Sequence, residues 1–296
     1  MFATVTLTAC HTPGPAVATP PDPRTDAVRA AIEAVAAADP DVEVAVVVDE
    51  SGGVRTALRP DLPMHAASTM KVPVMIEAFR QVADGRLAWD QPVPVENRFA
   101  SLVDGAPFAI AEDADDALYA SLGGTLPVRE LVERAITTSS NLATNLLLQR
   151  VTADSVQATA DRLGASGMRV RRGVEDLRAF EAGLNNETTA AALAALFVAL
   201  RDGRAVSPEA DAAMVEILAR QAHNEMLPAG LPPGTRVAHK TGWITSIHHD
   251  GGIVAPPGRA PYVLVVLTRG APDHGVSARL GADLARAVEG ALATAR

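Results

Sequence analysis

Apolar side chains recur at helical spacing along much of the chain, and this periodicity predicts most of its helices. In the clearest case, a buried stripe would run along one helix through Val72, Met75, Ile76, Phe79 and Val82. The same reasoning predicts further helices over 25–38, 128–136, 142–151, 155–163, 187–200, 208–219 and 276–292. Most of the predicted helices therefore lie in the middle of the chain.

Strand patterns occur only near the two ends of the sequence. Residues 42–48 are nearly all β-branched and apolar, which predicts a strand covered on both faces, and 54–58 would return as its hairpin partner. Further strands are expected at 236–239, 247–255 and 262–268. Strands at both ends with helices between them predict an α+β fold, a three-layer α/β/α sandwich whose antiparallel sheet comes from both termini.

This pattern also divides the chain. The α/β part would comprise 25–60 and 235–296, and an inserted all-α lobe would comprise about 61–234. The 296 residues are 48% hydrophobic and 21% charged, an ordinary globular composition with enough apolar material for a sizeable core. The net charge of −9 leaves no basic stripe to neutralise phosphates, which excludes nucleic acid as a partner. We expect a monomer that acts on a small molecule.

The only cysteine, Cys10, lies in a distinctive setting. Residues 7–10 read Leu-Thr-Ala-Cys, which resembles the cleavage box of bacterial lipoproteins, and a proline-rich spacer follows over 11–23. The apolar segment before the box is short and has no positively charged start, so a plain disordered tail is the alternative. We favour a truncated lipoprotein signal over 1–24. It predicts export to the cell envelope, in the periplasm or on the outer face of the membrane, with a lipid anchor on Cys10.

Ser68 and Lys71 are the first candidates for chemistry. Residues three apart on a helix lie on one face, so the hydroxyl and the ammonium would stand side by side. Pro73 fits this helix only if its first turn begins near Ser68 or Thr69. A serine hydroxyl needs a base within hydrogen-bond reach, and Lys71 can serve only while it is neutral. On its own, Ser-x-x-Lys is a weak signal.

Two later segments strengthen it. Residues 138–141 read Thr-Ser-Ser-Asn and 239–243 read His-Lys-Thr-Gly-Trp. In this order, Ser-x-x-Lys, Ser-x-Asn and Lys-Thr-Gly resemble the three-part signature of the penicillin-recognising serine enzymes, the class A β-lactamases and penicillin-binding proteins. The run from Asn141 to Leu148 is also similar to the corresponding segment of that family. The resemblance covers roughly Thr25 to the C-terminus.

The resemblance implies roles for the residues of the first two motifs. Ser68 would be the nucleophile and Lys71 its base, and Ser139 would relay a proton to the leaving nitrogen. Asn141 would hold Lys71 and the substrate amide. The middle residue is Ser140 rather than the aspartate usual in class A enzymes, and it would also cap a helix.

The third motif would bind the substrate. By resemblance, Lys240 supplies positive charge for a substrate carboxylate and helps to keep Lys71 neutral, while Thr241 donates a hydrogen bond to that carboxylate. The backbone N–H groups of Ser68 and Trp243 would form the oxyanion hole. Trp243 is bulky for this position, so it would either narrow the cleft or simply pack.

A β-lactamase also needs a carboxylate that activates the deacylating water. In class A enzymes it follows a Leu-Gly-x-x-x-x-Arg-x-x-Arg segment, which resembles Leu163 to Arg172 here. Glu175 lies one residue past the expected place. Glu181 begins a literal Glu-x-x-Leu-Asn, but it lies too close to Thr188, where the next helix should start. We prefer Glu175 to Glu181, and the alternative is that both only solvate a surface loop.

No metal or other cofactor is expected. His248, His249 and Asp250 are adjacent on a predicted strand, so their side chains point alternately to opposite faces and would not converge on one ion. A histidine near the cleft mouth would instead serve as a carboxylate or proton partner. Three further histidines have no constellation of candidate residues around them and are interpreted as isolated structural residues: His65, His223 and His274.

The leading hypothesis is a serine hydrolase of the class A β-lactamase type, which opens the β-lactam amide through an acyl-enzyme on Ser68. The first alternative is a D-alanyl-D-alanine carboxypeptidase-like amidase or esterase that acts on cell-wall peptide. The second is a penicillin-binding sensor with poor β-lactam turnover. A pure binder would not need the complete proton-transfer set, which argues against the sensor.

Overall fold

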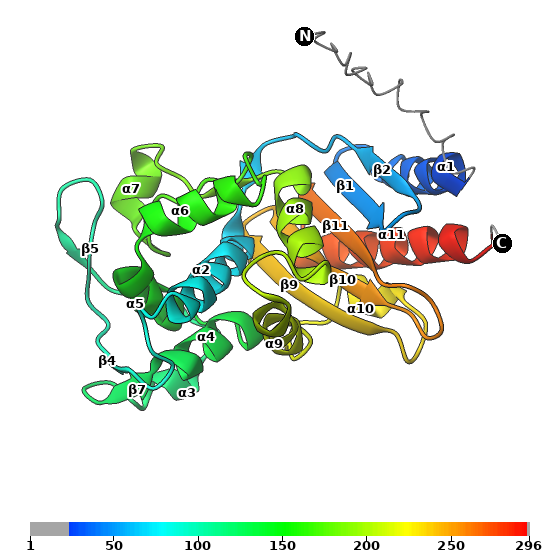
Figure 1. Cartoon of the computed structure of the whole chain (residues 1–296). Coiled ribbons are helices and arrows are strands. Elements are labelled where there is room, and N and C mark those ends of the chain that lie inside the picture. Colours follow the sequence, from blue (N-terminus) through cyan, green and yellow to red (C-terminus); the bar gives the residue numbers. More distant parts are fainter. Residues whose placement is uncertain (1–23, 295–296) are drawn as a thin grey trace, which may run out of the picture.

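A computed structural model describes residues 24–294, and within them five strands form one antiparallel sheet in the order β2-β1-β11-β10-β9 (Figure 1). The strands are β1 (Glu43–Glu50), β2 (Arg55–Leu58), β9 (Arg236–Ile244), β10 (Ile247–Ala255) and β11 (Tyr262–Arg269). β1 pairs with β11 along its whole length, from Glu43 opposite Arg269 to Glu50 opposite Tyr262. The prediction of one antiparallel sheet built from both ends of the chain is confirmed.

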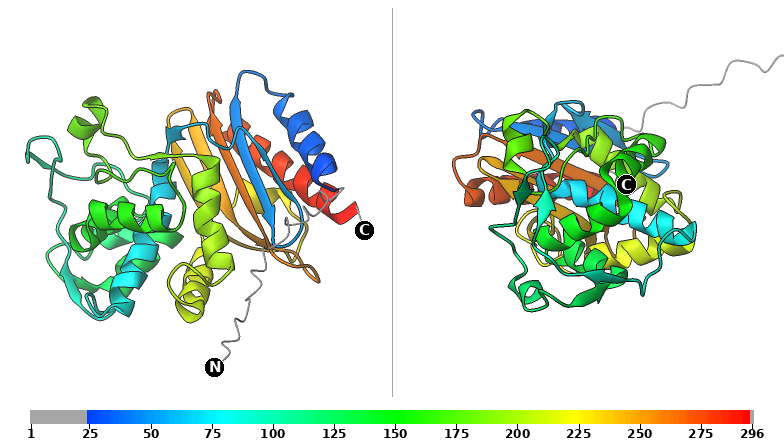
Figure 2. Two further views of the ribbon diagram at one scale, coloured as in Figure 1. Left: turned by 45° about the horizontal axis from the view of Figure 1, so that its top comes forward. Right: turned by 90° about the vertical axis from the view of Figure 1, so that its left-hand side faces the viewer.

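Helices cover both faces of this sheet, as the left view of Figure 2 shows. On one face lie α1 (Arg24–Ala36), α10 (Leu227–Gly230) and α11 (His274–Thr294), and on the other lies α8 (Ala190–Arg201). The alternation of side chains along β1 explains both layers, because Val44 and Val46 enter the core under α1 and α11 whereas Ala45 enters the core under α8. The predicted three-layer α/β/α sandwich is confirmed.

The rest of the chain forms a helical lobe beside the sheet (Figure 1). Its helices are α2 (Lys71–Ala83), α3 (Asp116–Tyr119), α4 (Val128–Thr137), α5 (Asn141–Val151), α6 (Ala153–Arg162), α7 (Leu177–Glu181) and α9 (Pro208–Leu218). Short two-stranded pairs border it: β3 (Met64–His65) with β8 (Glu187–Thr188), β4 (Pro92–Pro94) with β7 (Thr125–Pro127), and β5 (Phe99–Ala100) with β6 (Pro107–Phe108).

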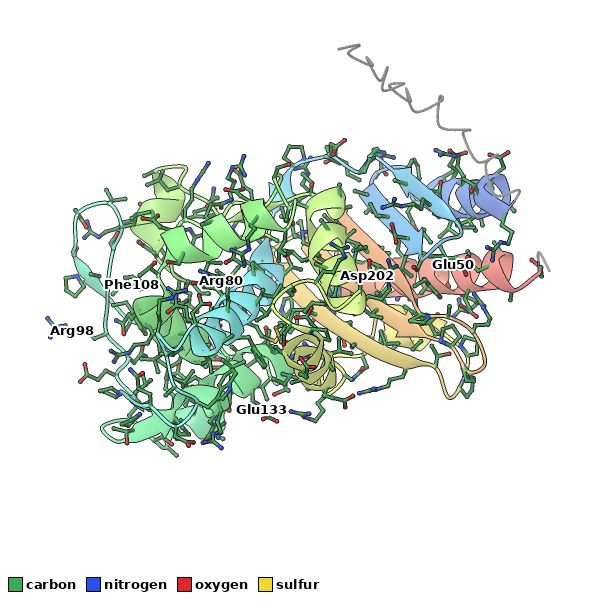
Figure 3. The ribbon with its side chains drawn as sticks, in the orientation of Figure 1. Glu50, Arg80, Arg98, Phe108, Glu133 and Asp202 are labelled. Atoms are coloured by element: carbon green, nitrogen blue, oxygen red, sulfur yellow. The ribbon has the colours of Figure 1, made fainter. Side chains whose placement is uncertain are left out.

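Helix α2 runs through the middle of this lobe, and two of its charged residues, Lys71 and Glu77, are buried. The carboxylate of Glu77 has no solvent exposure and accepts hydrogen bonds from Arg80, Gln81 and the Thr159 hydroxyl of α6. Arg80, labelled in Figure 3, donates hydrogen bonds to Glu77 on the same helix and to the Thr159 hydroxyl of α6. A partly buried ion pair with satisfied hydrogen bonds therefore links α2 to α6.

The structure corrects the start of one predicted helix. Glu187 and Thr188 pair with β3 as a strand, and the helix begins only after Thr189, whose hydroxyl accepts a hydrogen bond from the Ala192 N–H. Strand β9 continues to Ile244, well beyond the predicted 236–239. No helix within the described residues is both long and apolar enough to cross a bilayer. The lipoprotein box at Cys10 lies outside the described residues.

Candidate active site

Ser68 lies in a single turn of 3₁₀ helix, Ala67–Met70, that leads directly into α2. Pro73 is the third residue of α2, where its missing N–H leaves no hydrogen bond unmade. The preceding Ala67 has a φ of 45°, a conformation that a residue with a Cβ rarely adopts, and its N–H donates to His65 Nδ1 at 3.0 Å. The backbone is thus held in a strained turn immediately before the candidate nucleophile.

Lys71 is fully buried behind Ser68. Its Nζ contacts the Ser139 carbonyl oxygen at 2.5 Å, Asn141 Oδ1 at 2.8 Å and Ser139 Oγ at 3.3 Å. Burial lowers the pKa of Lys71 to about 7, although the nearby carboxylates of Asp113 and Glu175 oppose the shift. A neutral amine has two N–H groups for the two short contacts and keeps a lone pair that can accept a proton.

The hydroxyl of Ser139 links Lys71 to a second buried lysine. Lys240 Nζ donates to Ser139 Oγ at 2.9 Å and to the Thr241 carbonyl at 2.8 Å. Burial, followed by repulsion from Lys71, holds the pKa of Lys240 well below its ordinary value. Ser139 has a φ of 63°, so a strained backbone again positions a polar group of this cluster.

Strand β9 passes Ser68 at close range along the edge of the sheet. A Cβ at Gly242 would lie 2.7 Å from the Ser68 nitrogen and 2.9 Å from the Thr69 nitrogen, so only glycine fits there. The Thr241 hydroxyl is buried and has no hydrogen-bond partner in the described part of the chain. The three segments predicted to form the site therefore meet around Ser68, and an unused polar group remains for a ligand.

A family model described as the beta-lactamase enzyme family matches residues 27–292. This chain belongs to that family. Among curated relatives, it is 34% identical to a beta-lactamase of Streptomyces albus G over 147 residues, 48% of this chain and 47% of that protein. It is 35% identical to beta-lactamase AST-1 of Nocardia asteroides over 174 residues, 56% of each. The chain spans about half the length of the curated relatives that it matches.

Solved structures of this family agree with the fold. The class A beta-lactamase of the last common ancestor of Gram-negative bacteria is 27% identical, with a TM-score of 0.77 over 89% of this chain and 99% of the other. A beta-lactamase of Sphaerobacter thermophilus is 26% identical, with a TM-score of 0.74 over 90% and 97%. PBP-A, at 24% identity, superposes with a TM-score of 0.80 over 93% and 98%, which shows a shared fold.

In this beta-lactamase family member, Glu175 lies on a loop held against the helical lobe. Asn145 accepts a hydrogen bond from the Val174 N–H at 2.7 Å and donates one to the Val174 carbonyl at 2.9 Å. Glu175 follows with a φ of 62°, and its carboxylate accepts hydrogen bonds from the N–H groups of Ala111 at 2.6 Å and Glu112 at 3.3 Å. The carboxylate is close enough to raise the pKa of Lys71.

Glu181, the rival, occupies a different setting. It is exposed at the C-terminal end of α7. Both glutamates lie in one segment whose two ends are joined by hydrogen bonds, because Asn186 Oδ1 accepts from the N–H groups of Arg171 and Arg172. The charge of Glu175 acts to raise the pKa of Lys71, whereas Glu181 is exposed on α7.

Asp113 is a site residue that the sequence did not reveal. Its carboxylate accepts hydrogen bonds from the N–H groups of Asn141 at 3.0 Å and Leu142 at 2.8 Å, and from the Ser140 hydroxyl at 3.2 Å. The expected capping by Ser140 is confirmed, since its side chain accepts from the Ala143 N–H. Asp113 thus supplies a negative charge at the start of α5, and it does so from a different loop.

The histidines are arranged differently from their expected role as separate structural residues. His249 contacts the His65 carbonyl at 3.0 Å, so it points to the face opposite His248, as strand alternation predicted. Around Trp243, however, three histidine rings gather at centroid distances of 4.7 to 6.2 Å: His223, His248 and His274. The interpretation of His223 and His274 as isolated is therefore wrong. Trp243 is 38% exposed and packs with these rings.

Proposed function

We propose that this chain is a serine β-lactamase of the class A type that hydrolyses the β-lactam amide through an acyl-enzyme on Ser68. One observation supports this proposal above all: two buried lysines, Lys71 and Lys240, meet at one hydroxyl, Ser139 Oγ, beside the turn that carries Ser68. Burial lowers the pKa of a lysine, so it can act as a base near neutral pH, whereas an exposed lysine in an ordinary ion pair stays protonated.

Acylation would proceed in two proton transfers. Neutral Lys71 takes the proton of the Ser68 hydroxyl as the oxygen bonds to the β-lactam carbonyl carbon, and the backbone N–H groups of Ser68 and Trp243 stabilise the oxyanion. The C–N bond of the ring then breaks. Ser139 gives its proton to the leaving nitrogen and is reprotonated from the lysine pair, which leaves an ester on Ser68.

Hydrolysis of the ester would need a carboxylate, and we assign this role to Glu175. The carboxylate takes a proton from water as the water oxygen bonds to the ester carbonyl carbon, and Ser68 leaves with that proton. Glu175 fits this role better than Glu181, because its charge acts on Lys71 whereas Glu181 is exposed on α7. Asn141 and Thr241 would bind the substrate amide and carboxylate.

A chromogenic cephalosporin followed by absorbance and by protein mass tests this proposal. We expect sustained colour formation that Ser68→Ala abolishes, while the exposed Ser166→Ala variant remains active. An intact Ser68→Ala activity, or neither colour nor adduct with the unmodified protein, would refute the assignment.

A second function, acylation with slow release, is favoured by the contacts of Glu175. Its carboxylate is already engaged by the N–H groups of Ala111 and Glu112, and Asn145 holds Val174 rather than Glu175 itself. A penicillin-binding peptidase or sensor acting on cell-wall peptide would need no efficient deacylating base. A stable adduct on Ser68 without turnover would identify this alternative. If turnover is sustained, Glu175→Gln should trap the adduct and Glu181→Gln should not.

We also propose export to the cell envelope and lipidation of Cys10, which the Leu-Thr-Ala-Cys box and the proline-rich spacer after it support. A role in antibiotic resistance would follow only from the β-lactam hydrolysis proposed above. Labelling with a palmitate analogue in a bacterial host should mark the protein and not its Cys10→Ala variant. Equal labelling of both, or of neither, would reject the anchor.

A further inference from the structure

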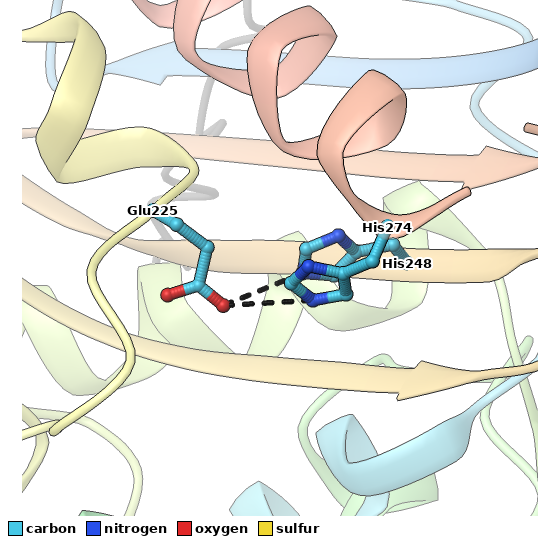
Figure 4. A group of neighbouring side chains, drawn as sticks. All are labelled: Glu225, His248 and His274. Carbon is cyan, nitrogen blue, oxygen red and sulfur yellow. Dashed lines mark ion pairs between the residues drawn. The ribbon is translucent and has the colours of Figure 1, made fainter.

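Three side chains from separate segments converge next to Trp243, outside the residues assigned to acyl transfer. Glu225 precedes α10, His248 lies on β10 and His274 begins α11 (Figure 4). Glu225 Oε1 lies 3.6 Å from His274 Nε2 and 4.0 Å from His248 Nε2, and the three ligand atoms all lie within 4.8 Å of one another. The cluster is thus built from residues far apart in the sequence.

The contact between His248 and Ser277 allows a tautomer of His248 in which Nε2 carries no proton. His248 Nδ1 lies 3.0 Å from Ser277 Oγ, and this hydroxyl is itself positioned to donate to the His274 carbonyl at 3.0 Å. When the hydroxyl donates to that carbonyl, Ser277 Oγ accepts a hydrogen bond from Nδ1–H, which leaves a lone pair on Nε2. A metal-binding histidine commonly has this arrangement, with its outer N–H held by a second residue.

The other nitrogen of His248 has no partner of its own. The side chain is 2% exposed, and Nε2 makes no hydrogen bond within the described residues. A lone pair and a carboxylate oxygen, both acceptors, consequently face each other across 4.0 Å. A cation between them would satisfy both.

We propose that Glu225, His248 and His274 bind a divalent transition-metal ion of the zinc class. Ligand atoms in a tetrahedral zinc site lie about 3.3 Å apart, since each bond is about 2.0 to 2.2 Å long. The observed 3.6 and 4.0 Å must shorten, and the His274 ring must also rotate, because its plane lies only 24° from that of His248 and an imidazole binds a metal through its in-plane lone pair. The partly exposed side chains of Glu225 (34%) and His274 (47%) have room for this movement. The imidazole rings of His248 and His274 are stacked at 4.0 Å, and both present Nε2 to the carboxylate (Figure 4).

The chemical types of the three ligands also predict which ions should bind. Two imidazoles and one carboxylate suit Zn²⁺, Co²⁺, Ni²⁺ and Cu²⁺, whereas Mg²⁺ and Ca²⁺ prefer oxygen ligands alone. Three protein ligands leave a fourth position open. Trp243 reports on the site, because its ring lies 5.6 Å from that of His274 and 6.2 Å from that of His248.

Calorimetric titration of the untagged, full-length protein with Zn²⁺ at neutral pH tests the proposal without any substrate. We expect saturable one-to-one binding, no binding of Mg²⁺, and quenching of Trp243 fluorescence by Ni²⁺ or Co²⁺. His274→Ala and Glu225→Gln change partly exposed side chains, so they should fold normally yet bind Zn²⁺ more than about tenfold more weakly. The exposed α9 variant Glu209→Gln is the matched control and should bind as the unmodified protein does.

A positioning role for Ser277 adds a finer test. Ser277→Ala removes the partner of His248 Nδ1 and should weaken Zn²⁺ binding by about 10- to 100-fold, with the Co²⁺ absorption bands shifted. Absence of one-to-one binding, or binding that His274→Ala and Glu225→Gln leave unchanged, would overturn the proposal. Both results are independent of β-lactam turnover, so this site can fail while the proposed acyl-enzyme chemistry stands.

Discussion

At the scale of single residues, burial decides the chemistry of this site. An exposed lysine is protonated at neutral pH, but Lys71 has lost its solvation shell and its pKa falls to about 7. Lys71 is therefore mostly protonated below pH 7 and mostly neutral, and able to act as a base, above it. Carboxylates near Lys71 work against its deprotonation.

The acylation rate should therefore rise with pH, with a midpoint near 7, because the free base of Lys71 forms in that range. Glu175→Gln removes a charge that raises the pKa of Lys71, so its midpoint should move to lower pH. Single-turnover mass spectrometry across the neutral range measures both curves. Glu181→Gln is the matched control and should leave the midpoint in place; an equal shift in both variants would contradict the assignment.

Gly242 provides a steric prediction. Gly242→Ala would place a Cβ 2.7 Å from the Ser68 nitrogen, which must displace the nucleophile turn or β9. We expect acylation to slow by about 100-fold or more, since small misplacements of reacting groups carry such costs. Gly290→Ala on α11 is the control: its Cβ meets nothing within 4 Å, and it should stabilise the fold by about 0.5 to 1 kcal/mol. Unimpaired acylation in Gly242→Ala would show that the close approach is unimportant.

The sequence could predict which residues form the site only where a short motif carries them. Ser68, Lys71 and Lys240 stand in such motifs, and the structure brings their segments together. Asp113 stands in a stretch without periodicity and acts on α5 from another loop, so no local pattern could reveal it. The ring cluster around Trp243 escaped for the same reason, because its members come from separate segments.

At the scale of elements, polar functional residues interrupt the apolar patterns from which strands are predicted. The strand signal along the sequence covers only 236–239, and the Lys-Thr-Gly residues were expected on a strand from the resemblance; in the structure they continue the ladder opposite β10. Helix α2 shows the opposite case: its apolar stripe predicted it well, but the lobe buries nearly all of its residues, not only those of the stripe. Even its acidic residue Glu77 must then be accommodated inside.

Glu77→Ala should destabilise the protein by about 3 to 5 kcal/mol, because it leaves Arg80, Gln81 and Thr159 without their shared partner in a buried setting. Chemical denaturation measures the loss. Glu130→Ala, which removes a partly exposed ion pair with Arg134 on α4, should cost less, about 1 kcal/mol. Similar losses in the two variants would show that burial of the Glu77 network contributes little.

At the scale of the whole molecule, one core joins the helical lobe to the sheet. Apolar side chains of α2, α8 and β11 belong to the same cluster, so the lobe is not an independent unit. The order of strand and helix signals along the chain was sufficient to predict this architecture. Strand signals occur only near the two ends of the chain, so a single sheet has to combine strands from both ends. The short border strands were not predictable, since two or three residues carry no periodicity.

Phe197 lies at this junction, and Phe197→Ala tests it. The ring is fully buried on α8 over the sheet, with Gly251 of β10 beneath it. We expect a loss of about 3 to 5 kcal/mol and a single calorimetric transition, since both parts share the core. Leu177→Ala, on the exposed face of α7, should change stability by about 0.5 kcal/mol or less. Two separated transitions in Phe197→Ala would show that the lobe and the sheet unfold independently.

The shared hydroxyl of Ser139 has a consequence for how the site responds to its ligand. Two ammonium groups so close together and so poorly solvated cannot both stay charged, so the pair carries one mobile proton between Lys71 and Lys240. An anionic group that settles beside Lys240 attracts that proton to its own side and frees the lone pair of Lys71. Binding of an acidic substrate would thereby leave Lys71 neutral and able to deprotonate Ser68. A neutral molecule of the same shape would not have this effect.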